Sequence, residues 1–159
     1  MTKQEIYNFL KDKNIQYTAV EHPAAFTVDE MKVLNLPHPE AGTKNLFLKD
    51  NKANFYLLTM KEDKRADLKA FGSLIGVKHL RFASEDDLMK VLGLIKGSVT
   101  LFGILNDEEQ KTKVYIDEEF RGELISAHPN ENTASVYLKT EDIVKLMLEH
   151  GNSVEYVTI

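Results

Sequence analysis

The 159-residue sequence contains no cysteine. This absence excludes a disulfide framework, a thiol nucleophile and any thiolate metal site. The sequence also lacks a run of about 18 apolar residues, which is the length that a membrane-spanning helix needs. Residues 1–13 lack the apolar stretch of a signal peptide. We therefore expect a soluble, cytoplasmic protein with no membrane partner.

The sequence has no excess of basic charge either. Its 20 Lys and Arg residues stand against 25 Asp and Glu residues, which gives a formal net charge of -5. This balance disfavours bulk binding of nucleic acid, and we expect no DNA partner. A local basic rim can still bind one RNA end, because phosphate contacts depend on where the cations lie and not on their sum.

Common catalytic and nucleotide-binding motifs are absent as well. The chain has no glycine-rich dinucleotide or P-loop motif, no H-E-x-x-H and no G-x-S-x-G. The five histidines are scattered without the spacing of metal ligands. We therefore expect neither a cofactor nor a metal.

The composition, 43% hydrophobic and 28% charged, is that of an ordinary globular protein. No flexible linker, internal repeat or low-complexity tract interrupts the chain. These features predict a single domain over residues 1–159.

Helix signals are clear at several points. Thr2 with Glu5 and Thr27 with Glu30 form capping boxes, each followed by apolar residues at helical spacing. Glycines follow three other periodic segments and predict their ends. The expected helices cover residues 2–13, 27–34, 67–75, 84–92 and 140–151.

Strand signals fill the rest of the chain. Two apolar runs, 45–49 and 55–60, flank a polar turn and predict a hairpin. Further strands are expected at 113–116, 124–125, 133–138 and 154–157. Hairpins and helices do not alternate as in doubly wound folds, so the expected class is α+β.

Three segments carry residues suited to binding. Residues 21–23 form a rigid turn just before the helix predicted from Thr27, where a phosphate or carboxylate can dock on free amides. The alternative is a loop shaped by Pro23, with His22 as an ordinary cap.

The second segment places Lys44 and Asn45 at the start of an apolar strand. Side chains alternate along a strand, so these two point to opposite faces, and one of them is expected to reach a cavity. The alternative is that Lys44 is a solvated charge that protects a strand edge.

The third segment, 97–103, is an apolar loop framed by two glycines, which let the backbone approach a ligand closely. The polar turn at 128–133 is its expected partner, although a plain turn explains that composition equally well. Together the segments supply these candidate substrate-binding residues: His22, Thr27, Asn45, Gly97, Ser98, Thr100, Phe102, Gly103, His128, Asn130 and Asn132.

In this order, the segments resemble the YbaK/ProX-type aminoacyl-tRNA deacylase family, the free-standing relatives of the editing insertion in bacterial prolyl-tRNA synthetases. The phrases at 44–48, 97–100 and 128–133 look most like the ProXp-ala branch, which clears alanine from mischarged proline tRNA. Leu101 departs from the pattern, because relatives usually have proline there, and we expect the change to alter loop stiffness and pocket shape. The matching stretches are 21–23 with 26–27, 44–48, 64–69, 97–100 and 128–134.

The resemblance implies a mixed, partly barrel-like sheet surrounded by helices, with a small pocket for the aminoacyl group. It assigns Lys44 as the catalytic lysine, whose ammonium neutralises the phosphate beside the ester. It implies mischarged proline tRNA, held at its acceptor end, as substrate and prolyl-tRNA synthetase as a possible partner. Met31, Leu46, Leu101 and Phe102 are candidate pocket walls.

No side-chain triad supplies a base, so the hypothesis is substrate-assisted hydrolysis. The terminal ribose 2′-hydroxyl activates water, while Lys44 and backbone amides near 97–103 hold the phosphate and the oxyanion. Asn45 and His128 orient the ester or the α-amino group. Specificity comes from a pocket that excludes proline.

Two alternatives to alanine editing remain open at this point. The same deacylase can act on Ser- or Cys-tRNA, or the protein can be a non-catalytic aminoacyl-tRNA-binding module. A basic cluster can contact the acceptor stem or can be a solvated helix flank. Its members are Lys61, Lys64, Arg65 and Lys69.

Overall fold

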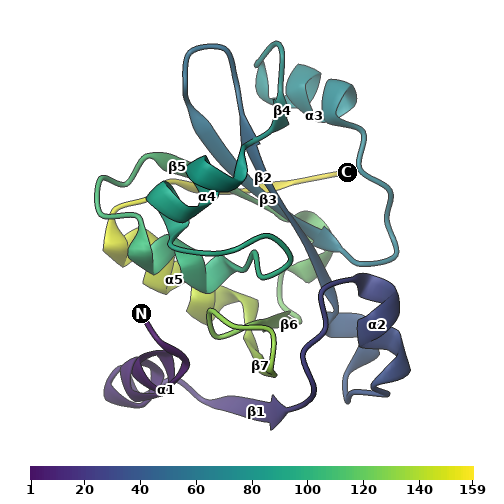
Figure 1. The fold of residues 1–159 in the computed structure, drawn as a ribbon, viewed down its shortest axis with the longest axis vertical. Coiled ribbons are helices and arrows are strands. Elements are labelled where there is room, and N and C mark those ends of the chain that lie inside the picture. The colour runs from purple at the N-terminus through teal and green to yellow at the C-terminus, as the bar shows by residue number, and fades with distance from the viewer.

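A computed structural model describes the backbone of residues 1–159 and every side chain except that of Val28. The chain folds into helices and strands of the expected α+β class (Figure 1). The helices are α1 (Lys3–Asp12), α2 (Val28–Val33), α3 (Leu68–Ile75), α4 (Glu85–Leu92) and α5 (Thr140–His150), with short 3-10 helices η1 (Pro39–Ala41), η2 (Leu101–Asn106) and η3 (Glu118–Phe120). The strands are β1 (Tyr17–Glu21), β2 (Thr43–Lys49), β3 (Phe55–Lys61), β4 (Arg81–Phe82), β5 (Thr112–Asp117), β6 (Leu124–Ala127), β7 (Ala134–Lys139) and β8 (Val154–Val157).

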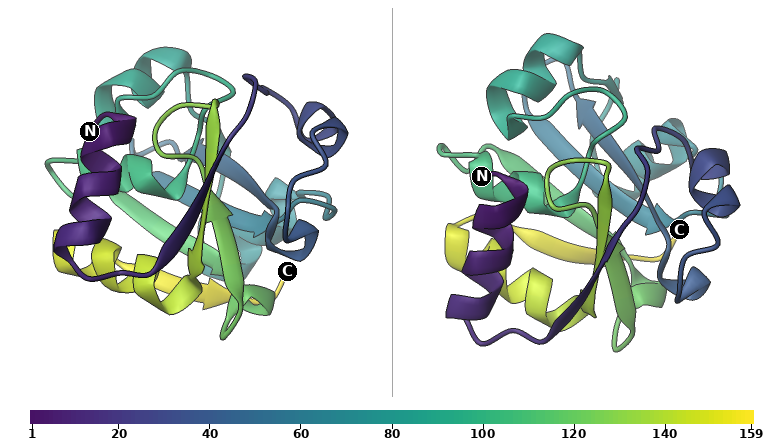
Figure 2. Two further views of the ribbon diagram at one scale, coloured as in Figure 1. Left: turned by 90° about the horizontal axis from the view of Figure 1, so that it is seen from below. Right: turned by 60° about the horizontal axis from the view of Figure 1, so that its bottom comes forward.

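The strands form two sheets. The larger has the order β4-β2-β3-β5-β8 and is mixed, because β3 and β5 pair in parallel, as do β5 and β8. The smaller, β1-β7-β6, is antiparallel throughout. Figure 2 shows β1 running along β7, with α1 and α2 toward opposite ends of this sheet. The expected partly barrel-like sheet is thus divided in two.

Two strands were not expected from the sequence, β1 and the two-residue β4. In β1 the alternation of apolar and polar residues breaks where Ala19 and Val20 adjoin, and the side chains are only half-buried or exposed. Its partner, β7, lies more than 100 residues away, with Tyr17 opposite Leu138. A pairing of this kind is decided by tertiary contacts and leaves no local signal.

The N-caps predicted at Thr2 and Thr27 are confirmed. Thr2 accepts a hydrogen bond from the Glu5 amide and Thr27 accepts one from the Glu30 amide, both at 3.1 Å. Gly76 and Gly93 end α3 and α4 in the left-handed region, at φ 74° and 65°. The helices end at these positions because glycine adopts positive φ without steric cost.

A large apolar core lies between the helices and the two sheets. Ile6 and Leu10 of α1 belong to the same buried cluster as Leu57 of the larger sheet and Phe102 of η2. A second cluster covers the opposite side of the larger sheet, where Phe71 of α3 meets Tyr115. The larger sheet is therefore buried on both faces. No helix in the described part of the chain is long and apolar enough to cross a membrane.

The turn of the β2–β3 hairpin is organised by Asp50, whose side chain is 6% exposed. Its carboxylate accepts hydrogen bonds from the amides of Lys52 and Asn54, from the Asn54 side chain, and from the Tyr56 hydroxyl at 2.9 Å. Burial alone would raise the pKa of Asp50, but these hydrogen bonds outweigh it and hold the pKa at about 2.

We predict that Asp50→Ala lowers the free energy of unfolding by about 2 to 3 kcal/mol, because it leaves the buried Tyr56 hydroxyl without its acceptor. Urea unfolding at pH 7 measures the change, and Asp12→Ala at an exposed helix end serves as the control. The folded-state pKa lies below the ordinary 3.8, so the contribution of Asp50 is present above that pH and is lost as the pH falls toward 2. An Asp50→Ala variant as stable as the wild type contradicts this account.

Candidate active site

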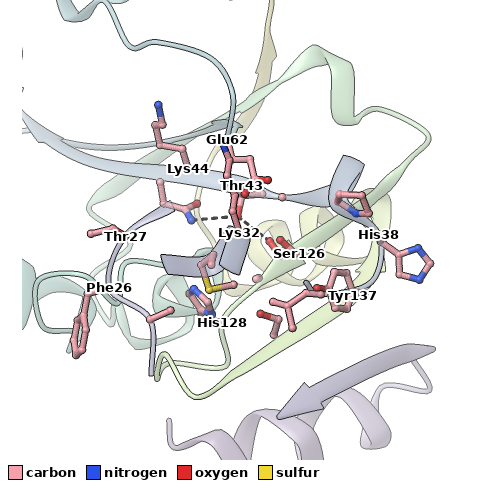
Figure 3. Close-up of a pocket in the computed structure, with 18 of the residues that line it drawn as sticks. Phe26, Thr27, Lys32, His38, Thr43, Lys44, Glu62, Ser126, His128 and Tyr137 are labelled. Atoms are coloured by element: carbon pink, nitrogen blue, oxygen red, sulfur yellow. Dashed lines mark hydrogen bonds between the residues drawn. The ribbon is translucent and has the colours of Figure 1, made fainter. Parts of the chain in front are cut away.

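A cavity of about 460 Å³ opens where the start of β2 meets the end of β6 and the first part of β7 (Figure 3). Its size is typical of small-molecule sites, which range from about 300 to 1,000 Å³. A hydrogen bond from the Thr43 hydroxyl to the Ser126 carbonyl, 3.1 Å long, joins the two sheets at its floor. Of the residues expected to bind substrate or form the pocket, Thr27, Met31, Lys44, Asn45, Gly97 and His128 line it.

His128, just after β6, is fixed by its environment in one tautomer. Its Nδ1 lies 2.8 Å from the Ala134 carbonyl, which can only accept, so Nδ1 carries the hydrogen. Burial lowers the pKa of His128 and the nearby His22 lowers it further, against the opposing effect of the Ala134 hydrogen bond. The ring is therefore neutral at pH 7, and Nε2 presents a lone pair.

His22 does not line the cavity but supports a residue that does. Its Nδ1 donates to the Pro23 carbonyl at 2.8 Å, and its Nε2 lies 2.9 Å from the Ser135 hydroxyl oxygen. Its ring lies edge-on to that of His128, with 6.1 Å between centroids. His22 thus orients the Ser135 hydroxyl at the cavity wall and does not cap α2.

Asn45 points toward the cavity and is held in one orientation. The Thr59 hydroxyl donates to its Oδ1 at 2.6 Å, and its Nδ2 donates to the Thr43 hydroxyl at 3.4 Å. Because the acceptor oxygen is occupied by Thr59, the amide nitrogen is the group turned to the cavity, and it retains one hydrogen for a ligand.

Lys44 leaves β2 on the opposite face from Asn45, as strand alternation predicts. It lines the rim of the cavity, and Figure 3 shows its side chain pointing away from His128 and Tyr137. Its ammonium donates to the Lys64 carbonyl, which leaves two hydrogens for other acceptors.

The basic cluster that contains Lys64 is partly committed to structure. Lys64 forms an ion pair with buried Asp117 at 2.9 Å and donates to the carbonyl of Ile159 at 2.8 Å. Lys61 donates to the Glu40 carbonyl and lies over the Phe120 ring. Only Arg65 and Lys69 are exposed, as a solvated flank would be.

The loop from Gly97 contributes backbone to the cavity. Gly97 adopts φ 86°, and the Phe26 ring packs so closely on it that a Cβ would lie 2.7 Å from the ring. In the described part of the structure the amides of Gly97 and Val99 have no hydrogen-bond acceptor, and both residues line the cavity. Two N–H groups are thus available to a ligand oxygen.

The other candidates in the two segments support the site without lining it. Thr100 donates to the His128 carbonyl at 2.7 Å and thereby joins the loop to the polar turn, as expected for partner segments. Asn130, at φ 63°, donates to the Met1 carbonyl at 2.9 Å. The residues that lie outside the cavity lining are His22, Ser98, Thr100, Phe102, Gly103, Asn130 and Asn132.

Three of the four apolar residues expected as pocket walls are packed in the core instead. Leu101 and Phe102 begin η2, which turns both side chains inward, and each is 1% exposed. Leu46 belongs to the cluster beneath α3. Gly103 serves the same packing, because a Cβ there would meet the Leu94 side chain. Met31 is the one expected wall residue that lines the cavity.

The N-terminus of α2 already has an anion beside it. The Glu30 carboxylate accepts a hydrogen bond from the Phe26 amide at 2.7 Å. An acidic group at this position stabilises the first helical turn. The expected docking of a phosphate or carboxylate at this helix would have to compete with Glu30.

Sequence reasoning missed several residues that line the cavity. Ser135 and Tyr137 stand on one face of β7, and the alternation that predicted this strand also placed them together, so that signal was available. Glu62 follows β3, and the predicted hairpin brings it close to the start of β2, but nothing in the sequence indicated that it lines a cavity. Among the described side chains, no group of three or more His, Asp or Glu is placed to hold a metal ion.

Comparison with known proteins places the chain among editing enzymes. A family model described as the aminoacyl-tRNA editing domain matches residues 22–146. The chain is 38% identical to the prolyl-tRNA editing protein ProX of Acetoanaerobium sticklandii, over 99% of this chain and 97% of that protein. It is 33% identical to prolyl-tRNA synthetase associated domain-containing protein 1 of Danio rerio, over 92% of this chain and 82% of that protein.

The fold also matches a solved structure. The crystal structure of a candidate trans-editing enzyme for prolyl-tRNA synthetase superimposes with a TM-score of 0.71 at 20% identity, over 99% of this chain and 96% of that one. This similarity shows a shared fold, while the family match and the full-length relative show membership. The chain therefore belongs to the aminoacyl-tRNA editing domain family and is an aminoacyl-tRNA deacylase of the YbaK/ProX type.

Proposed function

We propose that the protein removes alanine from mischarged proline tRNA by water attack on the aminoacyl ester, with assistance from the substrate 2′-hydroxyl. The observation that carries the proposal is one cavity to which three distant segments contribute Lys44, Asn45, Gly97 and His128. The full-length similarity to a prolyl-tRNA editing protein supports proline tRNA as the carrier.

The reaction breaks the bond between the carbonyl carbon and the ribose 3′-oxygen. Water adds to the carbonyl carbon, its proton passes by way of the 2′-hydroxyl, and the 3′-oxygen leaves as a hydroxyl. The Asn45 amide and the free N–H groups of Gly97 and Val99 donate to the oxyanion that forms on the carbonyl oxygen.

Lys44 acts on the tRNA end and not as the base. An ammonium at the cavity rim, with two hydrogens free, suits the phosphate of the terminal nucleotide. The Lys64 carbonyl holds this ammonium in place, and Lys64 is itself anchored by buried Asp117. Lys64 thus positions Lys44 without touching the substrate.

His128 orients the substrate as a neutral hydrogen-bond acceptor. Its Nε2 can accept from the attacking water or from another donor of the aminoacyl end. The Ala134 carbonyl fixes the tautomer of the ring, and Thr100 fixes the backbone of His128 through a hydrogen bond to its carbonyl. Orientation of this kind contributes to catalysis by reducing the entropy lost on reaching the transition state.

Specificity comes from steric exclusion, since a wall that admits alanine can reject the larger ring of proline. The cavity is larger than an alanyl group needs, so the terminal adenosine shares it.

The name of the Danio rerio relative refers to prolyl-tRNA synthetase, and this name supports that synthetase as a partner of this protein.

A panel of proline tRNAs carrying alanine, serine, cysteine or proline tests the substrate, and a fifth carries alanine on a 2′-deoxy terminal adenosine. We predict that alanine is released fastest and that the prolyl ester is hydrolysed at its uncatalysed rate. The 2′-deoxy substrate is expected to react about 100-fold more slowly, as loss of a proton-transfer group implies.

The panel also separates the alternatives. Faster release of serine or cysteine reassigns the substrate, and binding of charged tRNA without turnover identifies a non-catalytic module. An undiminished rate with the 2′-deoxy end shows that the protein itself supplies the base.

We predict that Lys44→Ala reduces deacylation about 10- to 100-fold, the range expected for the loss of one charge-assisted hydrogen bond. Single-turnover kinetics on alanyl-tRNA measure the change. Lys113→Ala, which removes an exposed strand lysine outside the cavity, is the matched control. Full activity of Lys44→Ala removes this lysine from the mechanism.

The neutral state of His128 has a measurable consequence for stability. Its folded-state pKa lies below the ordinary 6.5, so the unfolded chain binds the proton more tightly. We predict that the free energy of unfolding decreases as the pH falls below 6.5, and that the decrease is smaller in His128→Asn, which keeps the donor to Ala134 but cannot titrate. Urea unfolding between pH 5 and 8 compares the two, and identical pH profiles would show that His128 does not resist protonation.

A further inference from the structure

Glu62 brings a carboxylate into the active-site cavity that the mechanism above does not use. It follows directly on β3, and its amide donates to the Gly42 carbonyl at 3.2 Å. The carboxylate lies against the backbone of Gly42, where a Cβ would overlap it. Glycine at position 42 is what admits this side chain to the cavity wall, beside Thr43 (Figure 3).

This carboxylate has no partner. No hydrogen bond or ion pair to it occurs among the residues whose side chains are described. Burial raises the pKa of Glu62 and Asp63 raises it further, while the charge of exposed Lys32 on α2 opposes them. After burial, the Glu62 charge is the next cause that raises the pKa of Tyr137, so both groups face the same part of the cavity. A half-buried, unpaired carboxylate costs free energy unless a cation forms an ion pair with it.

The other groups of the cavity indicate which cation Glu62 binds. His128 is neutral, and exposed Lys32 lines the cavity but forms no ion pair with Glu62 among the described side chains. The Thr43 and Tyr137 hydroxyls and the Ser126 backbone are uncharged. The substrate of the proposed function has one cation near its ester, the α-ammonium group. We infer that Glu62 binds the α-ammonium of the aminoacyl ester and thereby selects substrates with a free amino group. The inference rests on the proposed function.

This role predicts discrimination against esters that resemble alanine but lack its charge. In the lactyl ester a hydroxyl replaces the ammonium and the methyl side chain is unchanged. Loss of a charge-assisted hydrogen bond is expected to slow deacylation about 10- to 100-fold. Glu62 supplies the charge that distinguishes the two esters, so removing this charge is expected to abolish most of the discrimination.

The experiment compares alanyl and lactyl esters of the same proline tRNA in single-turnover assays, with each rate divided by the uncatalysed hydrolysis of that ester at the same pH. The wild type is expected to prefer the alanyl ester about 10- to 100-fold. Glu62→Gln is expected to lower this preference to about 1, because it slows the alanyl ester far more than the lactyl ester. Asp63→Asn, which removes an exposed neighbouring charge, is expected to keep the wild-type preference.

Other outcomes overturn the inference in distinct ways. A Glu62→Gln variant that keeps the preference, or that slows both esters equally while remaining folded, shows that Glu62 does not bind the ammonium. If Glu62→Gln does not fold, Glu62→Asp retains the charge on a shorter side chain and is expected to keep part of the preference, and a full loss there contradicts the inference. No hydrolysis of either ester by the wild type overturns the proposed function itself.

Discussion

The alternation of side chains along β2 determines how the rest of the site is arranged. Successive residues of a strand point to opposite faces, so Thr43 and Asn45 face the cavity while Lys44 and Leu46 turn to the side of α3. A shift of one residue in the β2–β3 register would exchange these sets and bury the ammonium. The Asp50 turn holds that register, with Asn45 opposite Thr59. The contacts that stabilise the hairpin therefore also determine the geometry of the site.

The cavity exists because two sheets meet without merging. Thr43 links β2 to β6, and Thr100 links the 97–103 loop to the turn that carries His128. These contacts join segments that are distant in sequence, while the residues expected as walls are used to pack the core. Much of what looked like binding chemistry in the 97–103 and 128–133 segments is thus structural support. Among the described cavity residues, the groups assigned to the substrate are the Asn45 amide, two backbone N–H groups, the Nε2 of His128, and the two charges of Lys44 and Glu62.

Local signals in the sequence were sufficient to predict most of the helices and strands. The capping residues Thr2 and Thr27 bond their own helices, and Gly76 stops α3, because each acts within one turn of the chain. Strand β1 was not predicted from the sequence, because its pairing with β7 is long-range and its side chains do not alternate regularly between apolar and polar. Of the candidate site, the Lys44, Gly97 and His128 segments meet at one cavity, but motif membership did not distinguish a residue that lines the cavity, such as His128, from one that lies behind it, such as His22.

The sequence by itself determined the α+β class, the family resemblance and the segments that meet at the cavity, because capping, periodicity and motif phrases are properties of short stretches of chain. Only the tertiary structure decided that Phe102 belongs to the core, that the Lys64 carbonyl holds Lys44, and that Glu62 enters the cavity over Gly42. Each of these facts depends on which distant backbone lies beside the residue, and the free energy of such contacts arises from burial and hydrogen bonds that form only after the chain has packed.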